Sequence, residues 1–254
     1  MAEATLEAPG GAFAVPAAET VVGHALAACG DFSPGEGALY RRLVPPGGVV
    51  VDGGAHVGWF TRIFAEALGP RGRVHAFEPQ PALLALLERN LAGFPQALAH
   101  GAALGAAEGR GTVPAVRYDR PGTYGGLGLV QDGPGVAVPV TCVDALDLPR
   151  CDLIKADVQG MERELLIGAA DTIGRFRPLL YLENEDRERS PVLLSTLFAL
   201  GYRVFWHLPR VIEADAPPHL AAVISLNLLC VPEEAALPVE GLVEIRDRAD
   251  WWQP

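Results

Sequence analysis

Three acidic residues stand out because each follows an apolar run and precedes a change in chain character. Asp52 ends the run Val49–Val51 and is followed by two glycines, while Glu78 and Asp157 end two later apolar runs. A carboxylate at a strand end can accept hydrogen bonds from an ammonium group or from ribose hydroxyls, and it can take up a proton. These positions predict a ligand site. The turn after Asp52 fits a dinucleotide, a charged methyl donor or a plain tight turn.

The segment DGGAHVG, Asp52–Gly58, separates the two ligand classes. A dinucleotide site needs G-x-G-x-x-G across the first strand-to-helix turn, so that the backbone can approach a pyrophosphate. This chain has G-G-x-x-x-G and carries His56 where a second close-approach glycine is expected. Asp52 also suits a positively charged ligand better than a phosphate. S-adenosylmethionine, with its ammonium and sulfonium, therefore fits better, whereas Glu78 fits the ribose of either cofactor.

These residues need a scaffold, and the periodicity of the sequence predicts one. Short apolar runs that end in turn residues predict strands, and apolar residues spaced three and four apart predict helices. We expect strands at 48–52, 73–79, 96–105, 151–160, 178–186, 202–208 and 226–232, and helices at 59–69, 80–93, 161–173 and 190–201. This alternation predicts an α/β fold, in which a mostly parallel sheet carries helices on both faces.

The N-terminal part is expected to lie outside this alternation. Residues 1–16 are rich in Gly, Ala and Pro without periodicity, which predicts a flexible arm. Helical spacing at 19–30 and 36–44 predicts a helical lead-in over about 17–45.

The middle of the chain interrupts the alternation between about 106 and 140. There, 111–119 is a candidate extra strand and 120–135 is a glycine-rich loop. Neither a linker nor an internal repeat is visible, so residues 17–254 are expected to form a single domain with its core at about 46–232.

Composition narrows the range of functions. The net charge is −11 and the basic residues are scattered, which argues against a general nucleic-acid binder, because such binding depends on neutralising phosphates. No apolar run is long enough to span a membrane, and the first residues lack the pattern of a secretory signal. The four cysteines are far apart and form no C-x-x-C pair. We therefore expect a cytoplasmic protein without a membrane span.

Four motifs, in this order and spacing, resemble the FkbM family of S-adenosylmethionine-dependent methyltransferases. They are VVVDGGAHVGWFT at 49–61, AFEPQP at 76–81, LIKADVQGMERELLIGA at 153–169 and LLYLENE at 179–185. The resemblance covers about residues 46–232. It implies a Rossmann-like, doubly wound, mostly parallel seven-stranded methyltransferase sheet with an N-terminal helical extension. It also implies S-adenosylmethionine as cofactor and O-methylation of a hydroxyl on a sugar or secondary metabolite.

The resemblance further implies a role for each matched residue. The turn at the methionine end of the cofactor would consist of Asp52, Gly53, Gly54, Ala55, His56 and Gly58. Glu78, with Pro79 beside it, would bind the ribose, and Ala102 and Ala103 would border the adenine. Asp157 would face the reactive side of the cofactor. The family often has D-V-E-G where this chain has Asp157–Gly160, so we expect no charged role for Gln159.

Methyl transfer to a hydroxyl needs in-line positioning and usually a base. Asp157 at a strand end and His207 after a later strand are the two leading candidates for that base. Lys155 is expected to form a buried ion pair. The acceptor is expected to contact Tyr124, in a glycine-rich lid at 123–129, together with Glu183, Asn184 and His207. The six histidines lack metal-ligand spacing, so catalysis without a metal, and no metal-binding residue, is expected.

Two other function classes remain open at this point. The alternating fold and Glu78 would also suit an NAD-dependent oxidoreductase or epimerase, although the glycine fingerprint and a Tyr-x-x-x-Lys pair are missing. A non-catalytic cofactor-binding module is the third class. The expected partner is a small hydroxyl-bearing molecule, and a homo-oligomer is compatible with the sequence. Trp251 and Trp252 are expected to dock internally or on a partner.

Overall fold

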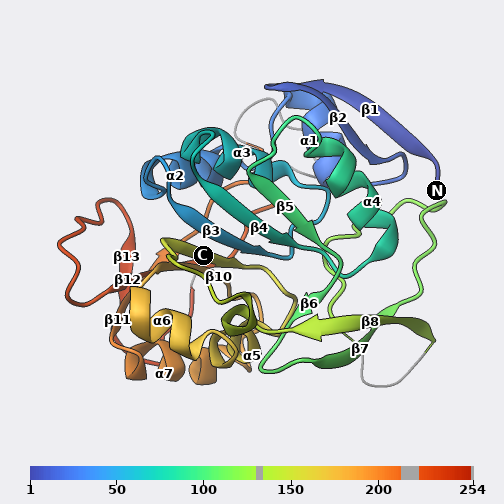
Figure 1. Ribbon diagram of the computed structural model, residues 1–254. Helices are drawn as coiled ribbons and strands as arrows, with labels where there is room; N and C mark the ends of the chain where they lie inside the picture. Colours follow the sequence, from blue (N-terminus) through green and yellow to red (C-terminus); the bar gives the residue numbers. More distant parts are fainter. Residues whose placement is uncertain (130–133, 213–222, 253–254) are drawn as a thin grey trace.

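The computed structural model describes residues 1–129, 134–212 and 223–252, and an eight-stranded sheet forms its centre (Figure 1). The strand order is β13-β11-β12-β10-β9-β3-β4-β5. The bounds are β3 Val49–Gly53, β4 Arg73–Phe77, β5 Ala97–His100, β9 Leu153–Ala156, β10 Leu179–Glu183, β11 Tyr202–His207, β12 Asn227–Pro232 and β13 Val243–Ile245. The five neighbouring strands β10, β9, β3, β4 and β5 are parallel to one another. Strand β12 runs antiparallel between β10 and β11. The predicted doubly wound, mostly parallel α/β sheet is confirmed, with β13 as an additional edge strand.

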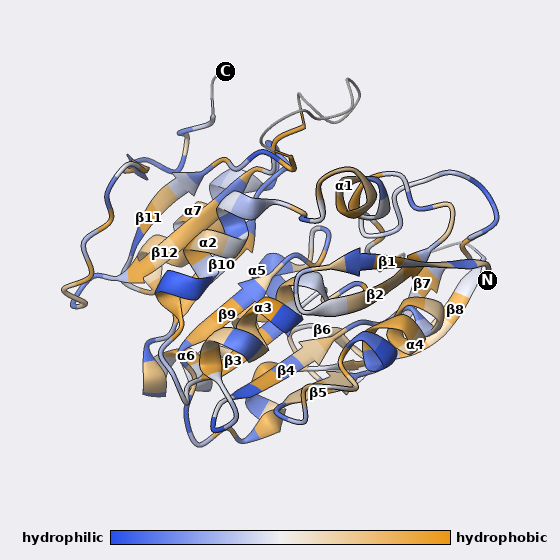
Figure 2. Ribbon diagram, turned by 90° about the horizontal axis from the view of Figure 1, so that it is seen from above, coloured by the Kyte–Doolittle hydropathy of each residue, from blue (hydrophilic) through white to orange (hydrophobic). Residues whose placement is uncertain are grey.

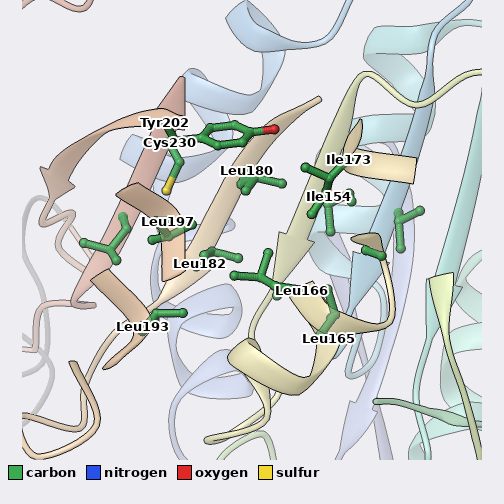
Figure 3. Packing of buried hydrophobic residues seen from close by; sticks show 14 of the residues in the cluster. Ile154, Leu165, Leu166, Ile173, Leu180, Leu182, Leu193, Leu197, Tyr202 and Cys230 are labelled. Carbon is green, nitrogen blue, oxygen red and sulfur yellow. The ribbon is translucent and has the colours of Figure 1, made fainter. Parts of the chain in front are cut away.

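Helices cover both faces of this sheet because side chains alternate across it. Helices α5 (Glu162–Ile167), α6 (Ala170–Phe176) and α7 (Ser190–Ala199) pack on one face. Figure 3 shows leucines of α5 and α7 turned toward β9 and β10, namely Leu165, Leu166, Leu193 and Leu197 toward Ile154, Leu180 and Leu182. Each fully buried leucine contributes roughly 1.5–3 kcal/mol.

The opposite face receives the helices that come earlier in the chain. They are α2 (Pro34–Leu43), α3 (Trp59–Leu68) and α4 (Pro81–Asn90), whereas α1 (Val22–Cys29) packs against residues 3–16. Val50 and Val51 illustrate the alternation, since Val50 packs with the α2–α4 side and Val51 with the α5–α7 side. The central strands are mostly hydrophobic in Figure 2, as expected for strands buried on both faces.

The single helix predicted at 161–173 is two helices, α5 and α6. The break falls at Gly168, where a Cβ atom would overlap the carbonyl oxygen of Gly105. The chain therefore passes another backbone segment too closely for a side chain, and this contact does not follow from the apolar periodicity of 161–173.

The prediction of a flexible arm at residues 1–16 is wrong, because these residues form a β-hairpin. Strand β1 (Glu3–Ala8) pairs antiparallel with β2 (Gly11–Pro16), and Gly10 and Gly11 both have positive φ angles at the turn. Phe13 and Val15 of β2 are buried, and the Asn90 side chain exchanges two hydrogen bonds of 2.8 Å with the backbone of Ala14. The hairpin was missed because short Ala- and Gly-rich strands carry little apolar signal.

A second, three-stranded sheet has the order β6-β8-β7. It consists of β6 (Ala103–Leu104), β7 (Gly109–Pro114) and β8 (Gly135–Thr141). Strand β7 lies near the candidate strand at 111–119, whereas β8 was not predicted. Part of the glycine-rich loop predicted at 120–135 lies outside the described residues. Among the helices that are described, none combines the length and the apolar character needed to cross a bilayer.

Candidate functional site

The turns after β3, β4 and β9 meet at one edge of the sheet. Gly53 of β3 pairs with Phe77 of β4 on one side and with Ala156 of β9 on the other. Glu78 and Asp157 directly follow those two partners in the sequence. Because parallel strands end at the same edge, the structure brings these acidic positions together, as the sequence predicts.

The turn after β3 is held tightly against both neighbouring strands. Gly54 has a φ of 75°, its N–H donates to the carbonyl of Phe77, and a Cβ atom here would overlap the carbonyl oxygen of Asp157. Gly58 has a φ of 91°, and a Cβ there would lie 2.6 Å from Leu87. Glycine is required at both positions, since a side chain would be strained and would clash.

Asp52 lies behind this turn and not in the pocket. Its carboxylate is fully buried, with Oδ2 accepting a hydrogen bond of 2.6 Å from Thr61 and Oδ1 lying 3.1 Å from Nζ of Lys155. The expected direct contact between Asp52 and a ligand ammonium therefore has no support in this geometry. Asp52 instead holds Lys155, whose Nζ also donates to the carbonyls of Gly53 and Gly54.

Lys155 forms the buried ion pair expected from the sequence. Its Nζ lies 3.9 Å from Oδ2 of Asp157 as well as 3.1 Å from Asp52. Burial alone would lower the pKa of Lys155, but the carboxylates of Asp52 and Asp157 more than offset this and raise the pKa above its ordinary value. Lys155 therefore stays charged and fixes the end of β3 to the end of β9.

Glu78 fixes the end of β4 to the same turn. Its carboxylate accepts hydrogen bonds from the backbone N–H of His56 at 3.0 Å and of Gln80 at 2.8 Å. Burial raises the pKa of Glu78 to about 7, although these two hydrogen bonds oppose the shift. The carboxylate keeps further lone pairs for a ligand.

A pocket lies in front of these groups, and most of the expected cofactor residues surround it. The lining shared with the sequence expectation is Gly54, Glu78, Pro79, Ala102, Ala103 and Asp157. The pocket does not include Gly53, Ala55, His56 or Gly58 in its wall, although they shape the turn behind it. The opposite wall consists of Tyr124, Gly125, Leu127 and Gly128. Tyr124, expected to contact the acceptor, thus lines the pocket that contains most of the expected cofactor residues.

His56 carries a buried ring nitrogen next to this pocket. Its φ of 52° is unusual for a residue with a side chain, and the bond from its N–H to Glu78 holds it there. Burial lowers the pKa of His56 to about 4, with Lys155 adding to the shift, so the ring is neutral near pH 7. Within the described part of the chain, its Nε2 is buried and has no hydrogen-bond partner.

Gln159 joins two carboxylates, a role that the sequence did not suggest. Its Nε2 donates to Oδ1 of Asp157 at 2.9 Å and to Oε2 of Glu183 at 2.8 Å. Burial, with the charges of Asp157 and Glu185, raises the pKa of Glu183 well above its ordinary value. Gln159 has a φ of 53°, and this backbone turn aims its amide at both acids.

A large polar cavity of about 1340 Å³ lies on the other side of Gln159. Its wall includes Glu162, Glu183, Glu185, Arg110 and Arg189, and it shares Gln159 and Met161 with the first pocket. Asn184 also lines the cavity, and its amide donates to Ser190 at the start of α7. The two cavities therefore meet at Gln159, beside Asp157.

His207 does not join this site. Strand β11 is separated from β9 by β12 and β10, which places His207 about 14 Å across the sheet from the Asp157 strand at the usual strand spacing. Its Nδ1 bonds the hydroxyl of Tyr181 at 2.7 Å, and burial lowers the pKa of His207 to about 4. It lines a separate cavity with Trp206, Trp251 and Trp252. Trp251 packs on Trp206, so the C-terminal tryptophans dock internally.

Glu36 is a buried acid that sequence reasoning missed. It accepts hydrogen bonds from the hydroxyls of Ser33 at 2.6 Å and Tyr40 at 3.1 Å, and from the Asn227 amide at 3.4 Å. Burial raises the pKa of Glu36 to about 7. The S-x-x-E spacing from Ser33 to Glu36 at the start of α2 is a capping signal that could have drawn attention to it.

Glu36 should make stability depend on pH. Its folded pKa of about 7 exceeds the ordinary 4.5, so the folded chain binds more protons between these values and loses stability as pH rises through them. In urea unfolding, the free energy of unfolding of Glu36→Gln should therefore rise by about 1–3 kcal/mol relative to that of the wild type between pH 4.5 and 7. Above pH 7 the difference should stay constant. Glu88→Gln, which removes an exposed carboxylate, is the control. If the difference in free energy of unfolding between Glu36→Gln and the wild type did not change with pH, the raised pKa of the buried Glu36 carboxyl would be contradicted.

No group of three or more His, Cys, Asp or Glu side chains in the described ranges is arranged to hold a metal ion. The candidate site thus consists of a small pocket, a large polar cavity and the acids between them.

Comparisons with known proteins identify the family of the chain. The model of the methyltransferase FkbM domain matches residues 52–204, more than half of the chain. The AMB antimetabolite synthetase AmbE of Pseudomonas aeruginosa is 28% identical in an alignment 215 positions long that covers 65% of this chain. The alignment covers only 10% of that synthetase, so this chain spans about a tenth of its length.

One solved structure shows the same fold, and a second aligns more weakly. The crystal structure of the methyltransferase FkbM from Methylobacillus flagellatus KT aligns with a TM-score of 0.50 and 17% identity, over 76% of this chain and 50% of that one. The crystal structure of a putative O-methyltransferase from Klebsiella pneumoniae aligns with a TM-score of 0.49 and 15% identity, over 80% and 81% of the two chains. From the family match, the chain belongs to the FkbM family of S-adenosylmethionine-dependent methyltransferases.

Proposed function

We propose that this chain O-methylates a hydroxyl of a sugar or secondary metabolite, with Asp157 as the base. The observation that carries the proposal is the position of Asp157. It lines the small pocket, and Gln159 links it to Glu183, which lines the large polar cavity. A base in this position can reach a hydroxyl that enters from the cavity and meets the methyl donor in the pocket.

The small pocket fits S-adenosylmethionine in three respects. Gly54 lets the turn after β3 pack against the backbone of Asp157 and adds only backbone atoms to the pocket wall, and Glu78 offers a buried carboxylate to ribose hydroxyls. Phe77, Ala102 and Ala103 provide an apolar border for adenine. The unpartnered Nε2 of His56 adds a buried polar atom beside the turn, and we propose that it faces the methionine end of the cofactor.

The large cavity fits a polar acceptor. Carboxylates and guanidinium groups along its wall can bind several hydroxyls, and Glu183 and Asn184 of the LLYLENE motif are part of this wall. The relative named as an antimetabolite synthetase supports a secondary metabolite as one source of such an acceptor.

The reaction as proposed uses positioning and one proton transfer. S-adenosylmethionine supplies an activated methyl group on a sulfonium. The acceptor oxygen forms the new bond to the methyl carbon while the carbon–sulfur bond breaks, and the hydroxyl proton passes to the Asp157 carboxylate. Lys155 and Gln159 hold Asp157 from two sides, and alignment of this kind can contribute roughly 7–11 kcal/mol. His207 takes no part, because its strand lies too far away.

Glu78→Ala tests the cofactor placement. Loss of a charged acceptor for the ribose hydroxyls should weaken binding of S-adenosylhomocysteine by about 1–3 kcal/mol, measured by calorimetry. Glu88→Ala, an exposed glutamate on α4, is the matched control and should leave the Kd unchanged. An unchanged Kd for Glu78→Ala, or wild-type protein that binds NAD but not S-adenosylhomocysteine, would refute the proposal.

A further inference from the structure

The segment Thr123–Leu129 forms an outer wall over the small pocket. Four of its residues face Glu78 and Asp157 across the pocket, namely Tyr124, Gly125, Leu127 and Gly128. The space enclosed between the two walls is about 40 Å³, whereas pockets that hold cofactors and similar molecules measure roughly 300–1,000 Å³. A cofactor can therefore enter only when this wall moves outward.

The segment spans the pocket from one turn to the other. A Cβ atom on Gly125 would lie 3.8 Å from Cδ2 of His56, and a Cβ atom on Gly128 would lie 2.5 Å from the carbonyl oxygen of Gln159. The contact at Gly128 is too close for any side chain. Gly126 has space by comparison, since its nearest neighbour is Oε1 of Gln159 at 3.7 Å. Gly128 is therefore the residue through which the segment packs most closely on Gln159, in the turn between β9 and α5.

The start of the segment is tied to the N-terminal part of the chain. The N–H of Gly122 donates to the carbonyl of Ala18, and the N–H of Thr20 donates to the carbonyl of Gly122, both at 3.1 Å. This places the segment after β7 beside the region that follows the hairpin (Figure 1). Ala18 and Thr20 lie outside the part of the chain that matches the family.

Tyr118 adds a second attachment, on the pocket itself. Its hydroxyl donates to Oε1 of Gln80 at 2.7 Å, and the N–H of Gln80 donates to the carboxylate of Glu78. The ring of Tyr118 lies 4.8 Å from that of Tyr124, which is buried. Tyr118 therefore connects the outer wall to the proposed ribose-binding carboxylate.

We infer that Thr123–Leu129 is a lid of the methyl-donor pocket, anchored by the Ala18–Thr20 segment and positioned by Tyr118. The inference rests on the proposed placement of the cofactor in this pocket. Cofactor exchange requires the contact between Gly128 and Gln159 to open while the base of the lid stays attached. The lid accordingly covers the cofactor, and not only the acceptor as the glycine-rich sequence suggested.

Rapid-mixing kinetics with S-adenosylhomocysteine test the lid through two glycines of the same segment. In Gly128→Ala the lid cannot close on Gln159, so both the association and the dissociation rate constants should rise, the latter about five- to hundredfold. Gly126→Ala makes the same chemical change where space is open, and it should leave both rate constants near the wild type. A slower association in Gly128→Ala, or equal behaviour of the two variants, would overturn the lid.

Tyr118→Phe keeps the test decisive even if Gly128→Ala does not fold. Loss of its hydrogen bond to Gln80 should speed both association and dissociation, the latter about two- to tenfold, without a matching loss of thermal stability. Tyr202→Phe loses a comparable bond, to the carbonyl of Pro178, far from the pocket and should leave both rate constants unchanged. Unchanged rates in Tyr118→Phe would overturn its positioning role. Wild-type protein that fails to bind S-adenosylhomocysteine would overturn the cofactor placement together with the lid.

Discussion

Replacing Lys155 by methionine should lower the free energy of unfolding by about 3–5 kcal/mol. The cause is the Asp52 carboxylate, which is fully buried and would lose its only cationic partner within the described residues. The hydrogen bond from Thr61 would remain, but a single neutral donor does not offset the cost of a buried charge. Lys155→Met would also free the carbonyls of Gly53 and Gly54, so S-adenosylhomocysteine should bind more weakly.

The double variant Asp52→Asn, Lys155→Met separates this charge effect from simple loss of packing. It removes the unpaired charge, and urea unfolding should therefore show it to be more stable than Lys155→Met alone. Lys155 is the only lysine in the sequence, so NMR should show a single lysine side-chain nitrogen signal. Because the pKa of Lys155 is raised, this signal should keep the chemical shift of a protonated ammonium at high pH. If the double variant were no more stable than the single one, the ion pair would not be the cause.

The central sheet could be predicted because its strands leave a strong local signal. Runs such as Val49–Val51 are apolar throughout, as strands buried on both faces must be, and they alternate with amphipathic helices. The N-terminal hairpin and β13 leave a weaker signal. Their stability comes from distant contacts, such as Asn90 with Ala14 and Val243–Ile245 with β11, which the sequence does not display.

The site was predictable where its residues follow strands that pair in parallel with the same neighbour. Glu78 and Asp157 follow strands on either side of β3, so their proximity follows from the parallel pairing. His207 lies away from Asp157 because β12 comes after β11 in the chain but lies between β11 and β10 in the sheet. Gln159 was missed since its bridge depends on a positive φ angle, and that angle is not encoded in its side-chain type.

Asp157→Asn should reduce methyl transfer about 10²–10⁴-fold, the usual contribution of a positioned base. The substitution keeps the shape of the side chain, and its amide oxygen can still accept the hydrogen bond from Gln159. Binding of S-adenosylhomocysteine should therefore stay close to the wild type, so that the loss falls on kcat. The measurement is the rate of S-adenosylhomocysteine release with a hydroxylated acceptor found by screening sugars and secondary metabolites.

His207→Ala provides the contrast for this prediction. Its imidazole belongs to the cavity lined by Trp206 and Trp251 and bonds Tyr181, so its removal should affect stability more than turnover. A large loss of kcat in Asp157→Asn beside near-normal kcat in His207→Ala would assign the proton transfer to the acid between the two cavities. The reverse pattern would mean that the acceptor enters from the tryptophan-lined side, and it would rule out Asp157 as the base. Because the two residues end strands that lie three positions apart, one acceptor hydroxyl cannot contact both, and the comparison has a single answer.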